Sequence, residues 1–279
     1  MKVMDLYSLK KRIFPVMLQD VQLDIQLENE PNYDLVVNLL NGVAANGRKY
    51  CRGELEFVLR YKKFLEMEGT ISMCNQNDIN LVETLIRKLN KDGIKGCLIE
   101  CGVYKGGMSM WMRAVDKFTS GDEVCRGDVR KLYMFDTFSY FPAPSPNAPK
   151  KEELIHNITK MLYTSYHTTN QIRDNFHKFG LSGDGLHFVE GEFKDTIPKF
   201  DIGDEIAFLR LDNDYYESVM LVLENYYSKI VKGGYIVIDD YLNDVVGCKE
   251  AVNDFRLFHC IETEICYSDD GPVYWRIDR

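Results

Sequence analysis

Long apolar runs are missing from this sequence. No stretch of about 18 apolar residues occurs, and a helix needs about 20 such residues to cross a bilayer, so no membrane-spanning helix is expected. Residues 1–20, MKVMDLYSLKKRIFPVMLQD, carry charges inside their apolar part, unlike a secretory signal peptide. Both absences predict a cytoplasmic protein without a membrane partner.

Positive charge is scarce as well. The 34 Lys and Arg residues are outnumbered by 43 Asp and Glu residues, which gives a formal net charge of −9. Binding along a nucleic-acid backbone requires dense basic side chains, so nucleic acid is not an expected partner. The 45% hydrophobic and 28% charged residues are typical of a globular protein and exclude a disordered or fibrous chain.

Paired cysteine motifs are absent too. None of the eight cysteines forms a CxxC pair or a Cys/His spacing typical of zinc sites. Several lie inside apolar runs, where cysteine behaves as a small buried hydrophobe. This distribution favours free thiols in a reducing compartment over a disulfide framework. The cysteines are Cys51, Cys74, Cys97, Cys101, Cys125, Cys248, Cys260 and Cys266.

The spacing of apolar residues changes near residue 94. Segments 34–44, 54–67 and 78–90 have apolar residues at helical intervals, which predicts a helical N-terminal extension over residues 1–94. In residues 95–279, short apolar runs alternate with helical segments, the pattern of βαβ units and of a mostly parallel sheet covered on both faces. The expected strands are 97–101, 132–136, 186–190, 206–212 and 234–239.

The chain closes with ETEICYS and VYWRID around SDDGP, which predicts an antiparallel hairpin. By fold analogy, a hairpin after five βα units distinguishes a class I methyltransferase sheet from a dinucleotide-binding one. The expected fold is therefore α/β: a doubly wound, mostly parallel seven-stranded sheet with a C-terminal antiparallel hairpin and the N-terminal extension. Residues 116–131 and 140–166 are expected to be long loops, candidates for a lid.

Two motifs at strand ends predict a nucleoside-containing ligand. Ligands of open α/β sheets bind beyond the carboxyl ends of the strands. The loop IECGVYKGG follows the first expected strand, with Ser109 near the start of the next helix. Its glycines permit close approach, and the helix N-terminus favours a carboxylate or a phosphate. Asp136, which ends the second strand, can accept the hydroxyls of a ribose. A ligand-free turn and a helix N-cap are the alternatives.

Four carboxylates follow the fourth and fifth expected strands: Asp212, Asp214, Asp239 and Asp240. At one rim of the sheet their charges would raise one another's pKa unless a cation offset them. Hard oxygen ligands suit Mg²⁺, so the sequence predicts a magnesium site, with helix caps and exposed turn acids as the alternative. Asp239 and Asp240 can both bind the ion only if the strand ends between them.

An ordered set of segments across residues 95–279 resembles the macrocin O-methyltransferase family, whose members methylate deoxysugar hydroxyls on macrolide and aminocoumarin antibiotics. One departure is Asn213, where a glycine is expected. The segments that carry the resemblance are IECGVYKGG, FDTF, IRDNFHKFGL, FVEGEFKDTIP, LRLDNDYYES, GGYIVIDDY, AVNDFR and VYWR.

The resemblance implies an Mg²⁺-dependent enzyme that transfers a methyl group from S-adenosylmethionine to a sugar hydroxyl, whether the sugar is free, nucleotide-linked or part of a glycan or glycoside. It also implies a homo-oligomer, a dimer or larger. Asp214 would be the general base, and Asp212, Asp239 and Asp240 would bind the metal. The implied cofactor contacts are Glu100, Gly102, Tyr104, Ser109, Asp136, Thr137, Gly191, Phe193 and Asp212.

Three other functions stay open at this point. A methyltransferase for a small catechol-like phenol would share the metal and the cofactor. A nicotinamide-dependent oxidoreductase would want a Tyr-x-x-x-Lys relay, which Tyr104 and Lys105 do not provide. A non-catalytic module that binds S-adenosylmethionine would be marked by loss of a metal carboxylate, and here all are present. The sequence does not specify which sugar or which hydroxyl is methylated.

Overall fold

The computed structural model describes residues 4–5, 24–25, 72, 74, 76–119, 129–162, 166–244, 246–268 and 271–279. The chain divides into two compact units. Met1–Thr70 and Lys117–Asp128 form one, and Ile71–Asp116 and Val129–Arg279 form the other. In the first unit, β1 (Met4–Asp5) pairs antiparallel with β2 (Asp24–Ile25). The helices expected over 34–44 and 54–67 lie outside the described residues.

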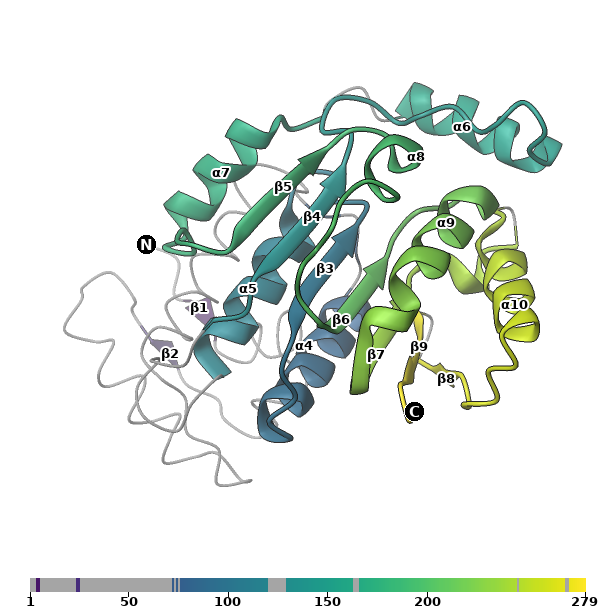
Figure 1. The fold of residues 1–279 in the computed structure, drawn as a ribbon. Helices are drawn as coiled ribbons and strands as arrows, with labels where there is room; N and C mark the ends of the chain where they lie inside the picture. Colours follow the sequence, from purple (N-terminus) through teal and green to yellow (C-terminus); the bar gives the residue numbers. More distant parts are fainter. Residues whose placement is uncertain are drawn as a thin grey trace. The chain divides into compact units, whose positions relative to one another are not determined.

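A seven-stranded sheet runs through the second unit in the order β5-β4-β3-β6-β7-β9-β8 (Figure 1). The first five of these strands are parallel to one another. Strand β9 pairs antiparallel with β7, and β8 pairs antiparallel with β9. This confirms the expected α/β fold and its C-terminal antiparallel pair. The strands are β3 (Cys97–Cys101), β4 (Leu132–Asp136), β5 (Leu186–Glu190), β6 (Ile206–Leu211), β7 (Ile230–Ile238), β8 (Cys266–Tyr267) and β9 (Val273–Arg276).

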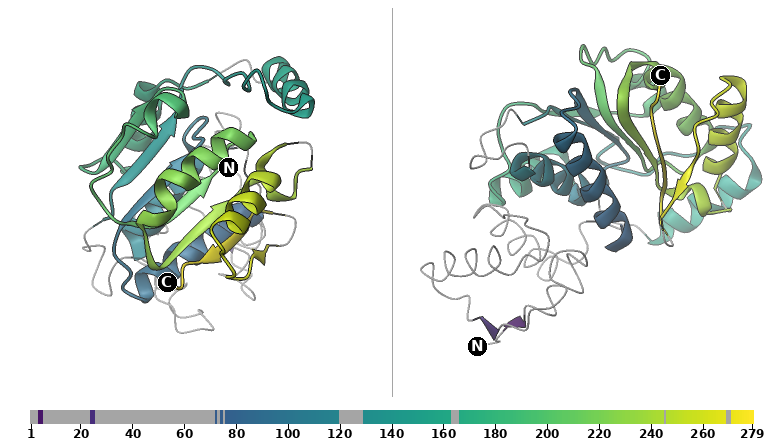
Figure 2. Two further views of the ribbon diagram at one scale, coloured as in Figure 1. Left: turned by 45° about the vertical axis from the view of Figure 1, so that its right-hand side comes forward. Right: turned by 90° about the horizontal axis from the view of Figure 1, so that it is seen from below.

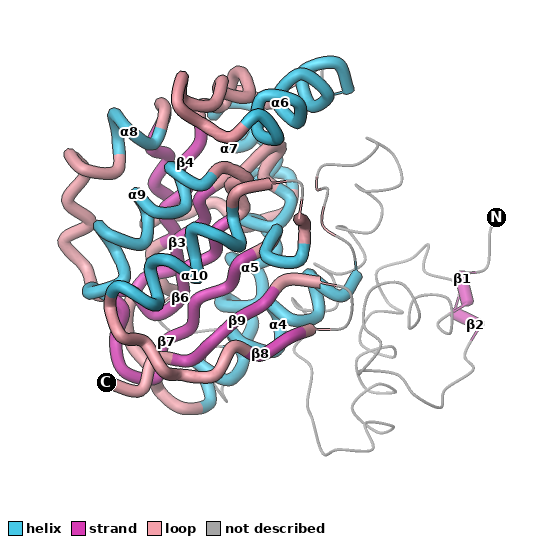
Figure 3. Tube along the Cα trace, turned by 90° about the vertical axis from the view of Figure 1, so that its right-hand side faces the viewer, coloured by secondary structure: helices cyan, strands magenta, loops and turns pink. Residues whose placement is uncertain are grey.

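Helices flank this sheet on both sides (Figures 2 and 3). Helices α4 and α5 lie on one face, and α9 and α10 lie on the other. The α4 helix confirms the helical spacing predicted over 78–90. It belongs to the second unit. The domain boundary at residue 94 stays a prediction. The helices are α4 (Gln76–Lys91), α5 (Gly107–Thr119), α6 (Lys150–Leu162), α7 (Thr169–Lys178), α8 (Phe193–Thr196), α9 (Tyr216–Tyr226) and α10 (Cys248–Phe258).

The central strands are buried on both faces. Every residue of β3 and of β6 is buried, which explains why these strands are nearly continuous apolar runs. Trp111 of α5 and Trp275 of β9 are almost completely buried in the same unit. The six described cysteines are free thiols, as the sequence predicts. Among the described residues, no helix is long and apolar enough to span a bilayer.

The segment 140–166 differs from the long loop expected there, because residues 150–162 form α6. Its apolar side chains recur at helical spacing, but the run FPAPSPNAPK before it drew the prediction toward a loop. Several of these side chains are exposed, including Leu154 at 61% and Met161 at 80%. Of the other expected loop, 116–131, residues 116–119 continue α5 and residues 120–128 lie outside the described residues.

Candidate functional site

A cavity of about 940 Å³ lies at the carboxyl ends of β3, β4, β6 and β7, where the order of the strands reverses between β3 and β6. This is the edge at which open α/β sheets bind ligands. Most of the predicted site residues line the cavity, namely Gly102, Tyr104, Asp136, Thr137, Phe193, Asp212, Asp214, Asp239 and Asp240.

The loop between β3 and α5 requires glycine at its first position. Gly102 has a φ of +91°, and a Cβ built there would lie 1.9 Å from the carbonyl oxygen of Asp212. Any side chain would therefore push β3 and β6 apart. The close approach brings the loop beside the carboxylates that follow β6.

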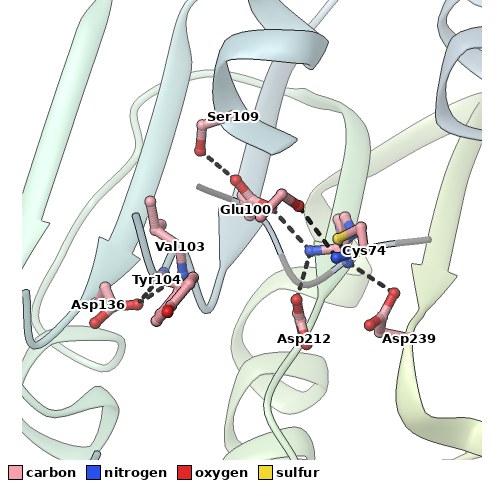
Figure 4. A network of polar contacts seen from close by, with 10 residues as sticks. Cys74, Glu100, Val103, Tyr104, Ser109, Asp136, Asp212 and Asp239 are labelled. Atoms are coloured by element: carbon pink, nitrogen blue, oxygen red, sulfur yellow. Dashed lines mark hydrogen bonds and ion pairs between the residues drawn. The ribbon is translucent and has the colours of Figure 1, made fainter. Parts of the chain in front are cut away.

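Asp136 holds this loop from the neighbouring strand (Figure 4). Its Oδ2 accepts hydrogen bonds from the backbone N–H groups of Val103 at 2.6 Å and Tyr104 at 3.0 Å. Its Oδ1 accepts one from the N–H of Phe138 at 2.9 Å. Asp136 thus lines the cavity and also orders the loop, a second role that its position in the sequence did not indicate.

Glu100 and Ser109 lie beneath the same loop. Glu100 is 1% exposed, Ser109 is fully buried, and the Ser109 hydroxyl donates a hydrogen bond to the Glu100 carboxylate. Burial raises the pKa of Glu100 to about 7. Neither residue is among those that line the cavity, so their predicted contact with a cofactor stays a prediction.

Gly191 and Phe193 follow β5. The N–H of Gly191 donates to the carbonyl oxygen of Asp136 at 2.9 Å, so the turn after β5 is tied to the end of β4. Phe193 begins α8 and lines the cavity. The predicted pair therefore lies beside Asp136, although only Phe193 contributes to the cavity wall.

Three carboxylates gather at the ends of β6 and β7. Asp212, Asp239 and Asp240 each offer an oxygen, and these atoms all lie within 4.8 Å of one another. The N–H of Asp239 donates to the carbonyl oxygen of Leu211 at 2.9 Å, which fixes the two strand ends side by side. Because β7 ends at Ile238 and Asp240 already belongs to a 3-10 turn, both carboxylates that follow the strand can reach the cluster.

Burial makes the negative charge of this cluster costly. It raises the pKa of Asp214 to about 6, and together with the charge of Asp214 it raises that of Asp240 to about 8. Burial also raises the pKa of Asp239. A bound cation would offset both this burial cost and the mutual repulsion of the carboxylates. The oxygen donors and their spacing are those of a site for a hard divalent ion.

Arg210 is the residue that the sequence reasoning missed. It is fully buried in β6, and its Nη1 binds Glu100 at 2.8 Å and Asp212 at 2.9 Å. Its Nη2 binds Asp239 at 2.7 Å and also donates to the Sγ of Cys74 at 3.1 Å (Figure 4). One guanidinium thus orients two members of the carboxylate cluster. A basic residue inside the apolar run IAFLRLD was the available signal, because buried arginines need charged partners.

Aromatic and proline residues form the outer wall of the cavity. Tyr140, Phe141 and Pro142 line it together with Tyr215, and the rings of Phe141 and Tyr215 lie 5.3 Å apart. Tyr140, Phe141 and Pro142 belong to none of the segments that carry the resemblance, whereas Tyr215 lies in LRLDNDYYES without an assigned role there. They give the cavity an aromatic and apolar part in addition to its carboxylates.

Comparison with known proteins places this geometry in a family. The chain matches the model of the macrocin-O-methyltransferase (TylF) family over residues 16–277. It is similar to 8-demethyl-8-(2,3-dimethoxy-alpha-L-rhamnosyl)-tetracenomycin-C 4'-O-methyltransferase of Streptomyces olivaceus, with 36% identity over 70% of this chain and 69% of that protein. It is also similar to mycinamicin III 3''-O-methyltransferase of Micromonospora griseorubida, with 32% identity over 74% of this chain and 78% of that protein.

The same relationship extends to a solved structure. The O-methyltransferase NovP shares 26% identity with this chain and superposes with a TM-score of 0.67, over 76% of this chain and 84% of NovP. These similarities confirm the resemblance seen in the sequence segments. The chain therefore belongs to the macrocin-O-methyltransferase (TylF) family and is an S-adenosylmethionine-dependent O-methyltransferase.

Proposed function

We propose that the enzyme methylates a hydroxyl of a neutral sugar carried on an apolar aglycone, with Mg²⁺ as a cofactor. The observation that carries the proposal is a cavity lined both by the carboxylates that follow β6 and β7 and by the aromatic and proline residues of segment 140–146. One similar enzyme is named for a rhamnosyl-tetracenomycin, a sugar on a larger group. We also expect a dimer or larger homo-oligomer, as the family resemblance implies.

The charge of the cavity favours a glycoside over a nucleotide-linked sugar. Among the described residues that line it, Lys194 is the one basic side chain, and it pairs with Glu192 at 2.5 Å. Eight lining residues are acidic. A diphosphate would enter a field of like charge, whereas a neutral sugar avoids this cost and its aglycone can pack against Tyr140, Phe141 and Pro142.

The cofactor is assigned to the part of the cavity beside the glycine loop. Gly102 and Tyr104 would face the methionine part, and Asp136 and Thr137 the ribose. Phe193 would pack against the adenosyl part, beside the turn that Gly191 ties to β4. Glu100 and Ser109 would support the loop from beneath, because both are buried and bonded to each other. The donor itself carries a positive sulfonium, which suits an acidic cavity.

Asp212, Asp239 and Asp240 would hold the Mg²⁺, and the donor set fits that ion. A bound ion would lower the pKa of an acceptor hydroxyl and hold its oxygen in a fixed position. Asp214 then removes the hydroxyl proton as general base. The acceptor oxygen forms its bond to the methyl carbon while the bond from that carbon to the sulfonium sulfur breaks, leaving S-adenosylhomocysteine.

The function is tested by offering the enzyme three classes of acceptor with S-adenosylmethionine and Mg²⁺. These are an aryl rhamnoside, a nucleoside-diphosphate rhamnose and a catechol, and methylated products are identified by mass spectrometry. We expect the rhamnoside to be methylated with the highest kcat/KM. Preference for the nucleotide sugar would overturn the proposed acceptor class. Preference for the catechol would favour the phenol methyltransferase instead.

Asp136→Ala should weaken the binding of S-adenosylhomocysteine by about 10- to 100-fold, since partly buried N–H groups of the loop lose a charged acceptor. Isothermal titration calorimetry measures the effect directly. The control is Asp174→Ala, which removes an exposed carboxylate from α7. Equal affinities in the two variants would remove Asp136 from the cofactor site.

Mg²⁺ at about 100 times its Kd should stabilise the native protein by about 2.7 kcal/mol, because it binds only the folded carboxylate cluster. Asp240→Asn should remove most of this gain, which thermal unfolding with and without EDTA would measure. Asp244→Asn is the control, since its side chain is 82% exposed. A gain that Asp240→Asn leaves intact would place the metal elsewhere.

A further inference from the structure

The start of α9 is not capped by its own residues. Tyr215 is the N-cap residue, and its side chain makes no capping hydrogen bond. A tyrosine cannot replace the Ser, Thr, Asp or Asn that normally accept from the first N–H groups of a helix. These N–H groups need another acceptor when they are buried. This matters because Asp214, the proposed general base, directly precedes Tyr215.

The missing acceptor comes from α6. The Oε1 of Glu152, in the first turn of α6, accepts a hydrogen bond from the N–H of Tyr216 at 2.8 Å, across 64 residues of sequence. Glu152 is 1% exposed. A carboxylate at this point also opposes the partial positive charge of the helix N-terminus. The α9 helix is therefore capped by a side chain from a different helix.

Gly247, the N-cap residue of α10, makes room for this contact. A Cβ built on Gly247 would lie 1.9 Å from the Glu152 Oε1 and 2.7 Å from the Tyr216 nitrogen. The N–H of Gly247 donates to the carbonyl oxygen of Asp214 at 3.0 Å. Glu152, Tyr216 and Gly247 thus form one junction, and the backbone of Asp214 is bonded into it.

The segment that Glu152 anchors is the outer wall of the cavity. In Figure 1, α6 lies beyond the carboxyl ends of β3, β4 and β5, and Tyr140 to Pro146 and Ile155 line the cavity. Other bonds from this segment to α9 and α10 include Ser145 with Glu217 at 2.6 Å and Lys151 with Glu250 at 2.5 Å. Both are exposed, and exposed pairs contribute little. By contrast, the buried carboxylate of Glu152 accepts a hydrogen bond that joins this segment to α9.

We propose that Glu152 is a positioning residue that seats the acceptor wall, residues 140–162, on the helix start that carries Asp214. The role assigned to Asp214 rests on the proposed function. The junction fixes the position of the acceptor wall relative to Asp214. Displacing Glu152 should therefore release residues 140–162 and the first turn of α9 at the same time. Glu152 also lines the cavity, and the role proposed for it is exerted through its hydrogen bond to the N–H of Tyr216.

Three variants of the full-length enzyme test this role. Glu152→Ala removes the acceptor, Glu152→Gln keeps an oxygen without the charge, and Glu153→Ala removes the exposed neighbouring carboxylate as a matched control. We expect Glu152→Ala to lower kcat/KM for the acceptor by about tenfold or more, with S-adenosylhomocysteine affinity within about twofold of wild type. Glu152→Gln should recover part of the loss, and Glu153→Ala should match the wild type.

Hydrogen–deuterium exchange supplies a readout that needs no acceptor. Glu152→Ala should accelerate exchange in peptides covering 214–222 and 140–162 together, while those covering β3 and β4 stay unchanged. Gly247→Ala, which keeps Glu152 but displaces it, should reproduce both accelerations. Wild-type exchange in Glu152→Ala would overturn the proposal even if no acceptor had been found. An equal loss of cofactor affinity and turnover would also overturn it, in favour of general destabilisation.

Discussion

Asp214→Asn is expected to reduce methyl transfer by about 10²- to 10⁴-fold, the usual contribution of a general base. Asp214 lines the cavity beside the carboxylate cluster, and its negative charge adds to the effect of burial in raising the pKa of Asp240. Asparagine has nearly the same shape and preserves hydrogen bonding, but it cannot accept the proton of the acceptor hydroxyl. The loss should therefore appear in the chemical step.

Binding of the cofactor should not change in this variant. The loop that would hold S-adenosylhomocysteine is ordered by Asp136 through Val103 and Tyr104, and Asp214 makes none of these contacts. Calorimetry with S-adenosylhomocysteine and single-turnover methyl transfer with saturating acceptor separate the two effects. Retention of more than about a tenth of the wild-type rate would show that another group takes the proton.

Arg210→Met is expected to destabilise the protein by about 3–5 kcal/mol, the cost of breaking a buried ion pair by removing one partner. Methionine fills a similar volume, so the effect reports charge rather than a cavity. Glu100 at 1% exposure would lose its guanidinium partner, and Asp239 would lose a contact of 2.7 Å. The remaining carboxylates would repel one another with no cation from the protein to offset them.

Urea unfolding measures this loss. Arg276→Met is the control, since Arg276 lies on β9 and pairs with Asp92 in an exposed position, where about 0–1 kcal/mol is expected. The double variant Arg210→Met with Glu100→Gln should recover part of the stability, because it removes the stranded charge as well. Stability of Arg210→Met within about 1 kcal/mol of wild type would contradict the role of Arg210 as charge partner.

Much of the fold follows from local pattern. The strands CLIEC and LYMFD coincide with β3 and β4, because a strand buried on both faces must be apolar along nearly its whole length. LHFVE coincides with β5, an edge strand whose residues are only partly buried. A local signal also exists at the start of α7, where Thr168 and Gln171 form a capping box. The α6 helix was not, because it follows a proline-rich run and leaves several apolar side chains exposed.

The residues of the site likewise divide into those that local sequence predicts and those that it does not. That carboxylates follow β6 and β7 could be predicted from the sequence, because the position of a residue at a strand end is a local property. The contact of Arg210 with Glu100 across 110 residues, and the capping of α9 by Glu152 across 64, arise from the folded arrangement of the elements. Which residues become partners depends on the order of the strands in the sheet and on how the helices pack against it. A buried charge or N–H group must find its partner in space, and sequence spacing does not specify which one.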